Sequence, residues 1–321
     1  MLAHHGLDLA RLAEKAGVAL KYEAAVAGGI PVIKGLREGA AANEISRVYG
    51  ILNGTCNYIL STMEAEGRDF ADVLKDAQEL GYAEVDPAFD IDGVDAAHKL
   101  SILASLAFGT EINFGDVDTT GIRDVIAADI SEAAALGYRV RLVAMAENSV
   151  DGLFQRVHPM LVPVGHPLAH VNGSLNAVVA EGNFVGSLFF QGRGAGAGPT
   201  ASAVVADLID VARDEYGDPF AMPVDSLARQ PKAPAGPRLG RCYLRFTVQD
   251  RPGVLAEIAT ALRDAGVSIE SLIQRGVSHD GSVLLAVVTH ITAQSSVSDT
   301  LARLAGSDSM IGAPMVMHIL D

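Results

Sequence analysis

The chain has 321 residues, of which 49% are hydrophobic and 20% charged, a composition typical of folded globular proteins and unlike that of disordered ones. A chain of this length usually exceeds what one hydrophobic core supports, so we expect two or more domains. The formal net charge of -15 and the scattered Lys and Arg residues argue against a nucleic-acid partner, which would need a concentrated basic surface.

The cysteines and the N-terminal residues bear on the compartment. Cys56 and Cys242 lie far apart and form neither a disulfide framework nor a zinc-ligand spacing, which predicts a reducing setting. The first residues, MLAHHGLDLARLAEKAG, lack the apolar core of a signal peptide, and no run of about 20 apolar residues follows. We therefore expect a cytoplasmic protein with no membrane partner.

The first elements indicate the end of an α/β unit. Residues 7–15 have helical spacing, and the run VALKYEAAV at residues 18–26 predicts a buried strand. A complete Rossmann domain opens with a strand, a glycine-rich turn and a helix, and none precedes residue 17. Residues 1–35 are therefore predicted to be the C-terminal remnant of a nucleotide-binding domain.

Residues 36–228 alternate helical patterns with strand-like runs. Strands are predicted at ISRVYGIL, RVRLVAMAE, LFQRVHPMLV, NAVVAEGNF and VGSLFFQG, and helices near residue 54 and at residues 70–80, 94–108 and 201–213. This pattern favours a catalytic and dimerisation domain of mostly open β-sheet with helices on one face. An open alternative is that the chain returns at about residues 192–213 to complete the nucleotide-binding domain.

A linker rich in Pro and Ala, residues 229–239, precedes the last region. Residues 240–321 show the order strand, helix, strand, strand, helix, strand, which is the ferredoxin-like βαββαβ module. The predicted fold class is therefore α/β and α+β.

The densest candidate site is residues 82–99, where five carboxylates fall within twelve residues. Asp95 and Lys99 are four apart on a predicted helix, on a stripe that continues through apolar Ile102 and Leu106. A lysine at such a buried edge can donate a proton, because burial lowers its pKa while the carboxylate holds it in place. The alternatives are a solvated acidic loop in which Asp92 caps the helix, and an exposed ion pair worth about 0.3–0.5 kcal/mol.

Three segments resemble those of homoserine dehydrogenases, in that family's order. They are GILNGTCNYIL at residues 50–60, LGYAEVDPAFDIDGVDAAHKL at residues 80–100 and GRGAGAGPTASAV at residues 192–204. The resemblance implies reduction of L-aspartate 4-semialdehyde to L-homoserine by NADH or NADPH, in threonine and methionine biosynthesis.

The resemblance also implies roles for the acidic segment. Lys99 is the implied proton donor, with Asp95 beside it. Glu84 and Asp90 are the implied substrate-binding residues, since anionic groups can hold the ammonium group of the substrate. The other two acids of the segment, Asp86 and Asp92, are expected to shape the loop.

Two glycine-containing loops take further implied roles. GRGAGA at residues 192–197 fits G-x-G-x-x-G/A and precedes a helix, but no strand with an acidic end follows about 20 residues later, so it is not a Rossmann fingerprint. In the family this loop approaches NAD or NADP from the catalytic domain, with contacts at the positions of Gly196 and Gly81.

The second loop, EAAVAGGIP at residues 23–31, by itself predicts only a strand and a turn, and a purely structural role stays open. It resembles the family's monovalent-cation loop. The resemblance implies a structural sodium ion bound through carbonyls at Val26, Gly28 and Ile30 together with the Glu23 region, and oxygen ligands suit such a hard cation.

In the last region, QDRPGVL at residues 249–255 joins a strand end, a tight turn and a helix start, and resembles the ACT regulatory domain. Asp250 could bind the ammonium group of an amino acid and the amides of Gly253 and Val254 its carboxylate, with threonine the candidate by analogy. The alternative is a domain that only supports dimerisation. The resemblance favours a homodimer or homotetramer.

Two expectations concern what the sequence lacks. The histidines show no H-x-x-x-H helix pattern and no carboxylate at useful spacing, so we expect no metal catalysis; they include His4, His5, His158, His166 and His170. Family members open with a G-x-G-x-x-G element and carry a later Thr-Ala-Asn-Lys segment, and this chain starts after both, which implies an N-terminal truncation of about 100 residues.

Two hypotheses about function follow. In the first, the chain is an oxidoreductase that works only when the nucleotide-binding part is supplied. In the second, it is a non-catalytic dimeric remnant that senses an amino acid through its C-terminal module. The preference between NADH and NADPH stays undetermined, because the residue that decides it belongs to that nucleotide-binding part.

Overall fold

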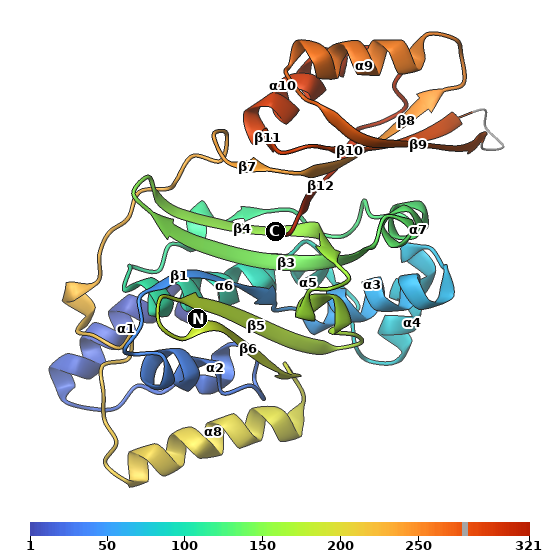
Figure 1. The fold of residues 1–321 in the computed structure, drawn as a ribbon. Coiled ribbons are helices and arrows are strands. Elements are labelled where there is room, and N and C mark those ends of the chain that lie inside the picture. Colours follow the sequence, from blue (N-terminus) through green and yellow to red (C-terminus); the bar gives the residue numbers. More distant parts are fainter. Residues whose placement is uncertain (278–281) are drawn as a thin grey trace. The chain divides into compact units, whose positions relative to one another are not determined.

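The computed structural model describes residues 1–277 and 282–321 and divides into two compact units (Figure 1). Unit 1 comprises Met1–Arg123, Arg141–His158 and Pro167–Ala233, and unit 2 comprises Asp124–Val140, Pro159–His166 and Pro234–Asp321. Two long strands, β3 (Tyr138–Ser149) and β4 (Gly152–Pro163), contribute residues to both. The predicted domain division at residues 35, 228 and 239 stays a prediction.

The other elements of unit 1 are helices α1 (Leu2–Ala16), α2 (Val32–Lys34), α3 (Gly54–Glu66), α4 (Phe70–Glu79), α5 (Ala88–Ile91), α6 (Val94–Phe108) and α8 (Ala197–Ala212), and strands β1 (Ile45–Ile51), β2 (Asp118–Thr119), β5 (Leu175–Gly182) and β6 (Gly186–Arg193). Those of unit 2 are helices α7 (Ala127–Ala135), α9 (Val254–Asp264) and α10 (Gln294–Leu304), and strands β7 (Leu239–Gly240), β8 (Cys242–Gln249), β9 (Ile269–Val277), β10 (Ser282–Thr289), β11 (Thr292–Ala293) and β12 (Met315–Ile319). No helix among the described residues combines the length and apolar character needed to cross a membrane.

The strands of unit 1 follow the order β6-β5-β1-β3-β4, with antiparallel pairing of β1 to both β5 and β3. Val48 of β1 lies opposite Ala180 on one side and Ala146 on the other, and all three side chains are fully buried. Helices α6 and α3 pack against β1 and β5. The predicted open sheet with helices on one face is confirmed, and it places the N-termini of both helices beside the end of β1.

The predicted strand at residues 18–26 is wrong. Glu23–Ala25 form a single 3-10 turn, and the rest of the run is irregular. The carboxylate of Glu23 accepts hydrogen bonds from the amides of Ile33 and Lys34, and Asp207 accepts one from the amide of Glu23. Asp207 therefore satisfies the Glu23 amide without a strand partner, and Glu23 in turn binds the first amides of α2.

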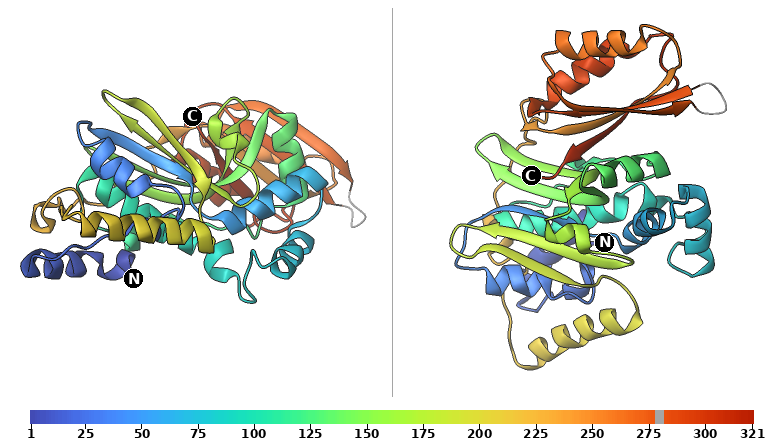
Figure 2. Two further views of the ribbon diagram at one scale, coloured as in Figure 1. Left: turned by 90° about the horizontal axis from the view of Figure 1, so that it is seen from below. Right: turned by 45° about the vertical axis from the view of Figure 1, so that its right-hand side comes forward.

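Helix α8 lies at the margin of unit 1, beyond α2 and away from the sheet (Figures 1 and 2). It begins at Ala197, four residues before the predicted start. Its large apolar side chains are exposed: Val204, Val205, Leu208, Ile209 and Val211. The helix therefore presents an apolar face that nothing in unit 1 covers.

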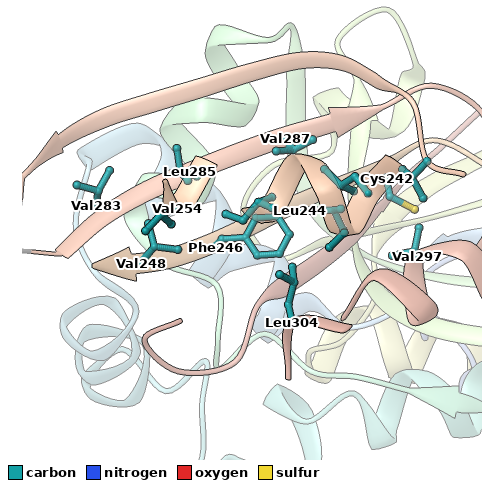
Figure 3. Close-up of a cluster of buried hydrophobic side chains, with 14 residues drawn as sticks. Cys242, Leu244, Phe246, Val248, Val254, Val283, Leu285, Val287, Val297 and Leu304 are labelled. Atoms are coloured by element: carbon teal, nitrogen blue, oxygen red, sulfur yellow. The ribbon is translucent and has the colours of Figure 1, made fainter. Parts of the chain in front are cut away.

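Unit 2 contains the predicted βαββαβ order as β8-α9-β9-β10-α10-β12, with the spatial strand order β12-β8-β10-β9. Its core is one cluster of buried aliphatic and aromatic side chains, including Leu244, Phe246 and Leu304, which Figure 3 shows gathered together. The unit also includes α7 and the end of β4, where Met160 lies opposite His318 of β12. The ferredoxin-like prediction is confirmed.

Candidate active site

A cavity of about 440 Å³ in unit 1 is lined by five of the six residues predicted to be catalytic, substrate-binding or cofactor-binding, namely Lys99, Asp95, Asp90, Gly81 and Gly196. It lies where β1 ends and where α3, α6 and α8 begin. Its lining residues are Asn53, Gly54, Thr55, Gly81, Tyr82, Asp90, Asp95, Lys99, Ser174, Ala195 and Gly196. The three segments that carry the family resemblance therefore meet at one cavity.

Asn53 connects the two carboxylates of this cavity. Its Nδ2 donates hydrogen bonds to Asp90 Oδ1 and to Asp95 Oδ2, both at 2.8 Å. Its Oδ1 accepts from the Cys56 amide at 2.8 Å, so the same side chain caps α3. Because the cap fixes the amide plane, both carboxylates have a defined position relative to the start of the helix.

Lys99 is held at the cavity by two acceptors. Its Nζ donates to Asp95 Oδ2 at 2.6 Å and to the Leu52 carbonyl at 2.9 Å, and that carbonyl also accepts from Asn176 Nδ2 at 2.8 Å. The side chains of Lys99 and Asp95 are 19% and 20% exposed. An ammonium group has three donors, so one remains for a group in the cavity. The expected partly buried pair is present, and an exposed surface pair is excluded.

Asp90 also has hydrogen-bond partners at the start of α3, Thr55 and Cys56. Thr55 Oγ1 donates to Asp90 Oδ2 at 3.0 Å, and Cys56 Sγ lies 3.2 Å from the Asp90 carbonyl. Cys56 is fully buried, and burial raises the pKa of its thiol well above the ordinary value. The thiol therefore stays protonated and packs under the site instead of acting as a nucleophile.

Glu84 does not join this cluster. It is exposed, its backbone carbonyl accepts from Gln78 Nε2, and its side chain is not among those lining the cavity. Tyr82, from the same loop, does line the cavity, and its ring stacks on that of Tyr58 with the centroids 4.5 Å apart. The sequence thus placed Glu84 in the correct loop, but the structure leaves it outside the cavity.

Asp92 is not the cap of α6, which contradicts one of the alternatives for this loop. The residue before the helix is Gly93, with φ 84°, and Asp92 instead accepts hydrogen bonds from Arg123. Asp86 Oδ1 accepts from the Ala88 amide at 3.1 Å. Both acids therefore shape the loop, as expected, although Asp92 does so through a partner 31 residues away.

The glycine loop joins β6 to α8, and β6 pairs antiparallel with β5. A Rossmann turn would follow a parallel strand, so the expectation that this loop is no such fingerprint agrees with the pairing. Gly196, with φ 116°, precedes α8 without a side-chain cap, and a Cβ on Gly81 would meet nothing within 4 Å. Open backbone and uncapped helix amides fit an anionic part of a cofactor here.

The predicted sodium loop, residues 23–31, is held by hydrogen bonds to carboxylate side chains and not by strand pairing. The Glu23 carboxylate is occupied by the two amides at the start of α2, and the Ile30 carbonyl accepts from Val32. Burial raises the pKa of Glu23. Gly28 lies close to the Gly194 carbonyl, where a Cβ would approach to 3.1 Å. The loop thus lies against the glycine loop of the cavity.

In unit 2, the predicted amino-acid turn lies between β8 and α9. Gly253, with φ 98°, precedes α9 and has no side-chain cap, while Asp250 is exposed. Glu257 occupies the first turn of α9, and its carboxylate accepts from Ser309 Oγ at 2.7 Å. Hydrogen bonds from Ser307 and Ser309 lower the pKa of Glu257.

The expectation that the histidines lack a carboxylate partner is wrong for His158. His158 does have a carboxylate partner, because parallel pairing of β2 with β4 brings Asp118 to 3.3 Å from His158 Nε2. Sequence spacing could not show this pair, since the two residues are 40 apart. No group of three or more His, Cys, Asp or Glu side chains within residues 1–277 and 282–321 could hold a metal ion.

Sequence reasoning assigned no role to four residues at or near the cavity. Asn53 and Thr55 lie inside a family-like segment, and an Asn before a helix start is a recognisable cap signal. Asn176 and Arg123 carry no such signal, because their partners lie far away in the sequence. Asn176 Oδ1 is buried and has no hydrogen-bond partner among the described residues.

Comparison with known proteins identifies the family. Residues 31–209 match the family model "Homoserine dehydrogenase" and residues 243–306 match the ACT domain. A homoserine dehydrogenase of Pseudomonas aeruginosa is 46% identical over 319 residues, which cover 97% of this chain and 74% of that protein. The solved homoserine dehydrogenase of Thiobacillus denitrificans matches with TM-score 0.92 and 43% identity, covering 100% of this chain and 74% of that one.

A third relative is a hyperthermophilic archaeal homoserine dehydrogenase solved in complex with NADPH. It matches with TM-score 0.58 and 32% identity, over 66% of this chain and 61% of that one. The matches cover both units and all three cavity segments. The chain therefore belongs to the homoserine dehydrogenase family of oxidoreductases.

Proposed function

We propose that the protein reduces L-aspartate 4-semialdehyde to L-homoserine with NADH or NADPH, and that Lys99 donates the proton. The observation that carries this proposal is the third Nζ donor of Lys99, which two protein acceptors leave available at the cavity. NAD(P)H, when bound, supplies the hydride that adds to the aldehyde carbon. The ammonium of Lys99 then protonates the developing alkoxide, which completes the alcohol.

Asp95 and Asp90 act before and during this step. Asp95, at 2.6 Å, holds and orients Lys99 Nζ before transfer, and solvent can restore the lost proton because the side chain is 19% exposed. Asp90 binds the ammonium group of the substrate, with its position set by Asn53 and Thr55. Glu84 is proposed to add a second anionic contact from the exposed loop. Gly81 and Gly196 would contact the cofactor.

The test is turnover by the purified protein, followed through NADPH absorbance with aspartate semialdehyde. Lys99→Ala is expected to lower kcat about 10²–10⁴-fold, the usual contribution of general acid catalysis. Lys75→Ala is the matched control, because Lys75 also faces an acid four residues away, at 4.0 Å, but is 76% exposed. Equal turnover of Lys99→Ala and wild type would remove Lys99 from the mechanism, and a protein without turnover would remove the activity from this chain.

We also propose that unit 2 binds an amino acid, with threonine the first candidate, at Asp250, Gly253 and Val254. The ACT match and the uncapped start of α9 support this site. Threonine is expected to raise the melting temperature, and Asp250→Ala to abolish that rise. A threonine-dependent shift in a protein that binds no NADPH would favour the second hypothesis, a non-catalytic sensor, and no shift would count against the site.

A structural sodium ion is proposed at the carbonyls of Val26, Gly28 and Ile30, together with the Glu23 region. The close approach of this loop to the glycine loop supports a role in organising the cavity. Sodium chloride is expected to raise the melting temperature above that in choline chloride of equal ionic strength. Identical melting temperatures in the two salts would exclude the ion.

The proposed assembly is a homodimer or homotetramer. Large apolar side chains exposed around β6 support it, among them Phe184, Val185 and Phe189, which are 85%, 40% and 39% exposed. Light scattering is expected to give a multiple of the 33.4 kDa chain mass. A mass of one chain at micromolar concentration would contradict this proposal.

A further inference from the structure

The carbonyl of Leu52, the residue after β1, binds two side chains beside the cavity. Lys99 Nζ donates to it at 2.9 Å and Asn176 Nδ2 at 2.8 Å. A backbone carbonyl has two lone pairs, so these two donors use its full accepting capacity. Leu52 and Asn176 are each 1% exposed, which places both of them inside unit 1, away from bulk water. One of the two acceptors of Lys99 is therefore itself bound to Asn176.

Asn176 lies on β5, opposite Gly192 of β6. The bond to Leu52 is its only side-chain hydrogen bond among the residues that the structure describes, since Oδ1 has no partner there. If the amide were turned over, Oδ1 would face the Leu52 carbonyl oxygen, and two acceptors repel each other. An aliphatic side chain would fill the same space without burying an unused acceptor. The donor Nδ2 is therefore what this position contributes.

Two glycines lie against the Asn176 amide. A Cβ on Gly194 would lie 2.2 Å from Asn176 Cγ and 2.4 Å from both Nδ2 and Oδ1. A Cβ on Gly54, the first residue of α3, would lie 3.3 Å from Asn176 Oδ1 and 2.7 Å from the Ser174 carbonyl oxygen. Gly194 belongs to the glycine loop at residues 192–197. The amide is thus enclosed between the start of α3 and the glycine loop, which leaves it no room to turn.

We propose that Asn176 is a positioning residue for the proton donor, because it fixes the Leu52 carbonyl that in turn fixes Lys99. A carbonyl with one donor can follow that donor, whereas a carbonyl bound from both β5 and α6 keeps its direction. Asp95 holds the other side of the ammonium group at 2.6 Å. The third donor of Lys99 then has one defined direction into the cavity, which transfer to a bound substrate needs. The description of Lys99 as proton donor rests on the proposed function.

Chemical labelling of lysines measures the hold on Lys99 without requiring turnover. Limited acetylation followed by peptide mass spectrometry gives the ratio of label on Lys99 to label on Lys75, a 76% exposed reference in the same molecule. Asn176→Ala is expected to raise this ratio about two- to tenfold, the range for the loss of one hydrogen bond.

The matched control is Gln155→Ala, which should leave the ratio unchanged. Gln155 is 3% exposed, its Nε2 donates to the Asn113 carbonyl at 2.8 Å, and its Oε1 has no partner in the described part of the chain. The control therefore removes a buried amide with the same number of hydrogen bonds as Asn176. It differs in having no bond to Leu52.

Gly194→Ala tests the same amide from the glycine loop. The new methyl group needs the space of the Asn176 amide, so the bond to Leu52 should break and the labelling ratio should rise as in Asn176→Ala. The double variant should label no faster than either single variant, because both changes remove one and the same interaction. Gly198→Ala is the labelling control, since a Cβ there would meet nothing within 4 Å.

Asn176→Asp separates hydrogen bonding from packing. The two side chains have nearly the same shape, but a carboxylate cannot donate to the Leu52 carbonyl, whereas a protonated carboxyl can. Burial raises the pKa of such a carboxyl, so that it titrates in a measurable range. In an active protein, kcat of Asn176→Asp relative to wild type should therefore fall as the pH rises. KM should change little, because Asn176 acts on the proton donor and not on substrate binding.

An unchanged ratio in Asn176→Ala, or an equal rise in Gln155→Ala, would overturn the positioning role. Additive effects of Asn176→Ala and Gly194→Ala would overturn it too, as would a kcat of Asn176→Asp that follows wild type at every pH. If Asn176→Ala does not fold, Gly194→Ala and Asn176→Asp carry the same test. Faster labelling of Lys99 in variants of a protein that shows no turnover would support the placement and contradict only the proposed function.

Discussion

Two aspartates at helix starts, Asp95 of α6 and Asp129 of α7, have similar partners and different surroundings. Asp95 accepts from a lysine and an asparagine amide, and Asp129 from an arginine and a tyrosine hydroxyl. The Asp95 side chain is 20% exposed at a cavity, whereas Asp129 is fully buried. The partners alone therefore do not distinguish a reactive carboxylate from a structural one.

The difference lies in what remains available to a ligand. Asp129 uses both oxygens on protein donors, because Oδ1 accepts from Tyr243 and Arg245 and Oδ2 from the Ile126 amide. Lys99, beside Asp95, keeps one donor at the cavity. We infer that Asp129 fixes α7 to β8 and that Asp95 serves the chemistry.

The largest expected effect concerns Asp129. Asp129→Ala leaves the 11% exposed side chain of Arg245 without its buried partner, and the free energy of unfolding should fall by about 3–5 kcal/mol. Urea unfolding measures this change. The control is Asp225→Ala, which removes an 85% exposed partner of Arg11 and should leave the midpoint unchanged. Equal midpoints for Asp129→Ala and wild type would show that the hydrogen bonds of Asp129 with Ile126, Tyr243 and Arg245 add nothing to stability.

Asn53 is the corresponding test at the cavity. Asn53→Ala removes the amide shared by Asp90 and Asp95, and the resulting misplacement should lower kcat/KM by about 10²-fold. Loss of the helix cap should cost about 1 kcal/mol of stability, so the variant is expected to fold. Asn183→Ala, at an exposed turn where Asn183 accepts from the Glu44 amide, is the control. Wild-type kcat/KM in Asn53→Ala would contradict the positioning role.

The pH dependence of stability tests whether Asp129 behaves as a buried carboxylate. Burial raises the pKa of Asp129 above its unfolded value of about 3.9, even though Arg245 opposes this shift. A carboxyl with a raised folded pKa contributes stability at low pH and loses it as the pH rises through the folded pKa. The difference in unfolding free energy between wild type and Asp129→Asn should therefore be largest in acid and shrink toward neutral pH. A difference independent of pH would show that Asp129 does not titrate abnormally.

The smallest effect concerns the exposed counterpart of the Asp95–Lys99 pair. Glu79 and Lys75 have the same four-residue spacing, but their side chains are 68% and 76% exposed. Glu79→Ala should lower the free energy of unfolding by at most about 0.5 kcal/mol and leave turnover unchanged. A larger loss of stability would mean that spacing, and not exposure, determines the strength of such pairs.

Much of the fold was predictable because its signals are local. The helix at residues 94–108 and the βαββαβ order follow from periodicity and turn residues, and both agree with the structure. The strand predicted at residues 18–26 failed because the Glu23 amide donates to Asp207 and the Glu23 carboxylate accepts from Ile33 and Lys34, contacts that periodicity cannot reveal. Glu84 was predicted from a motif, and a motif does not specify which side of a loop its side chain occupies.

By itself, the sequence determined the family, the order of the elements and the Asp95–Lys99 pair, since residues four apart on a helix share a face whatever surrounds them. Only the tertiary structure decided that Asn53 joins two carboxylates, that Asp92 binds Arg123 and that Asp118 meets His158. These contacts join residues that are distant in the sequence. They exist because strand pairing and helix packing bring the chain segments together, and no local pattern encodes that geometry.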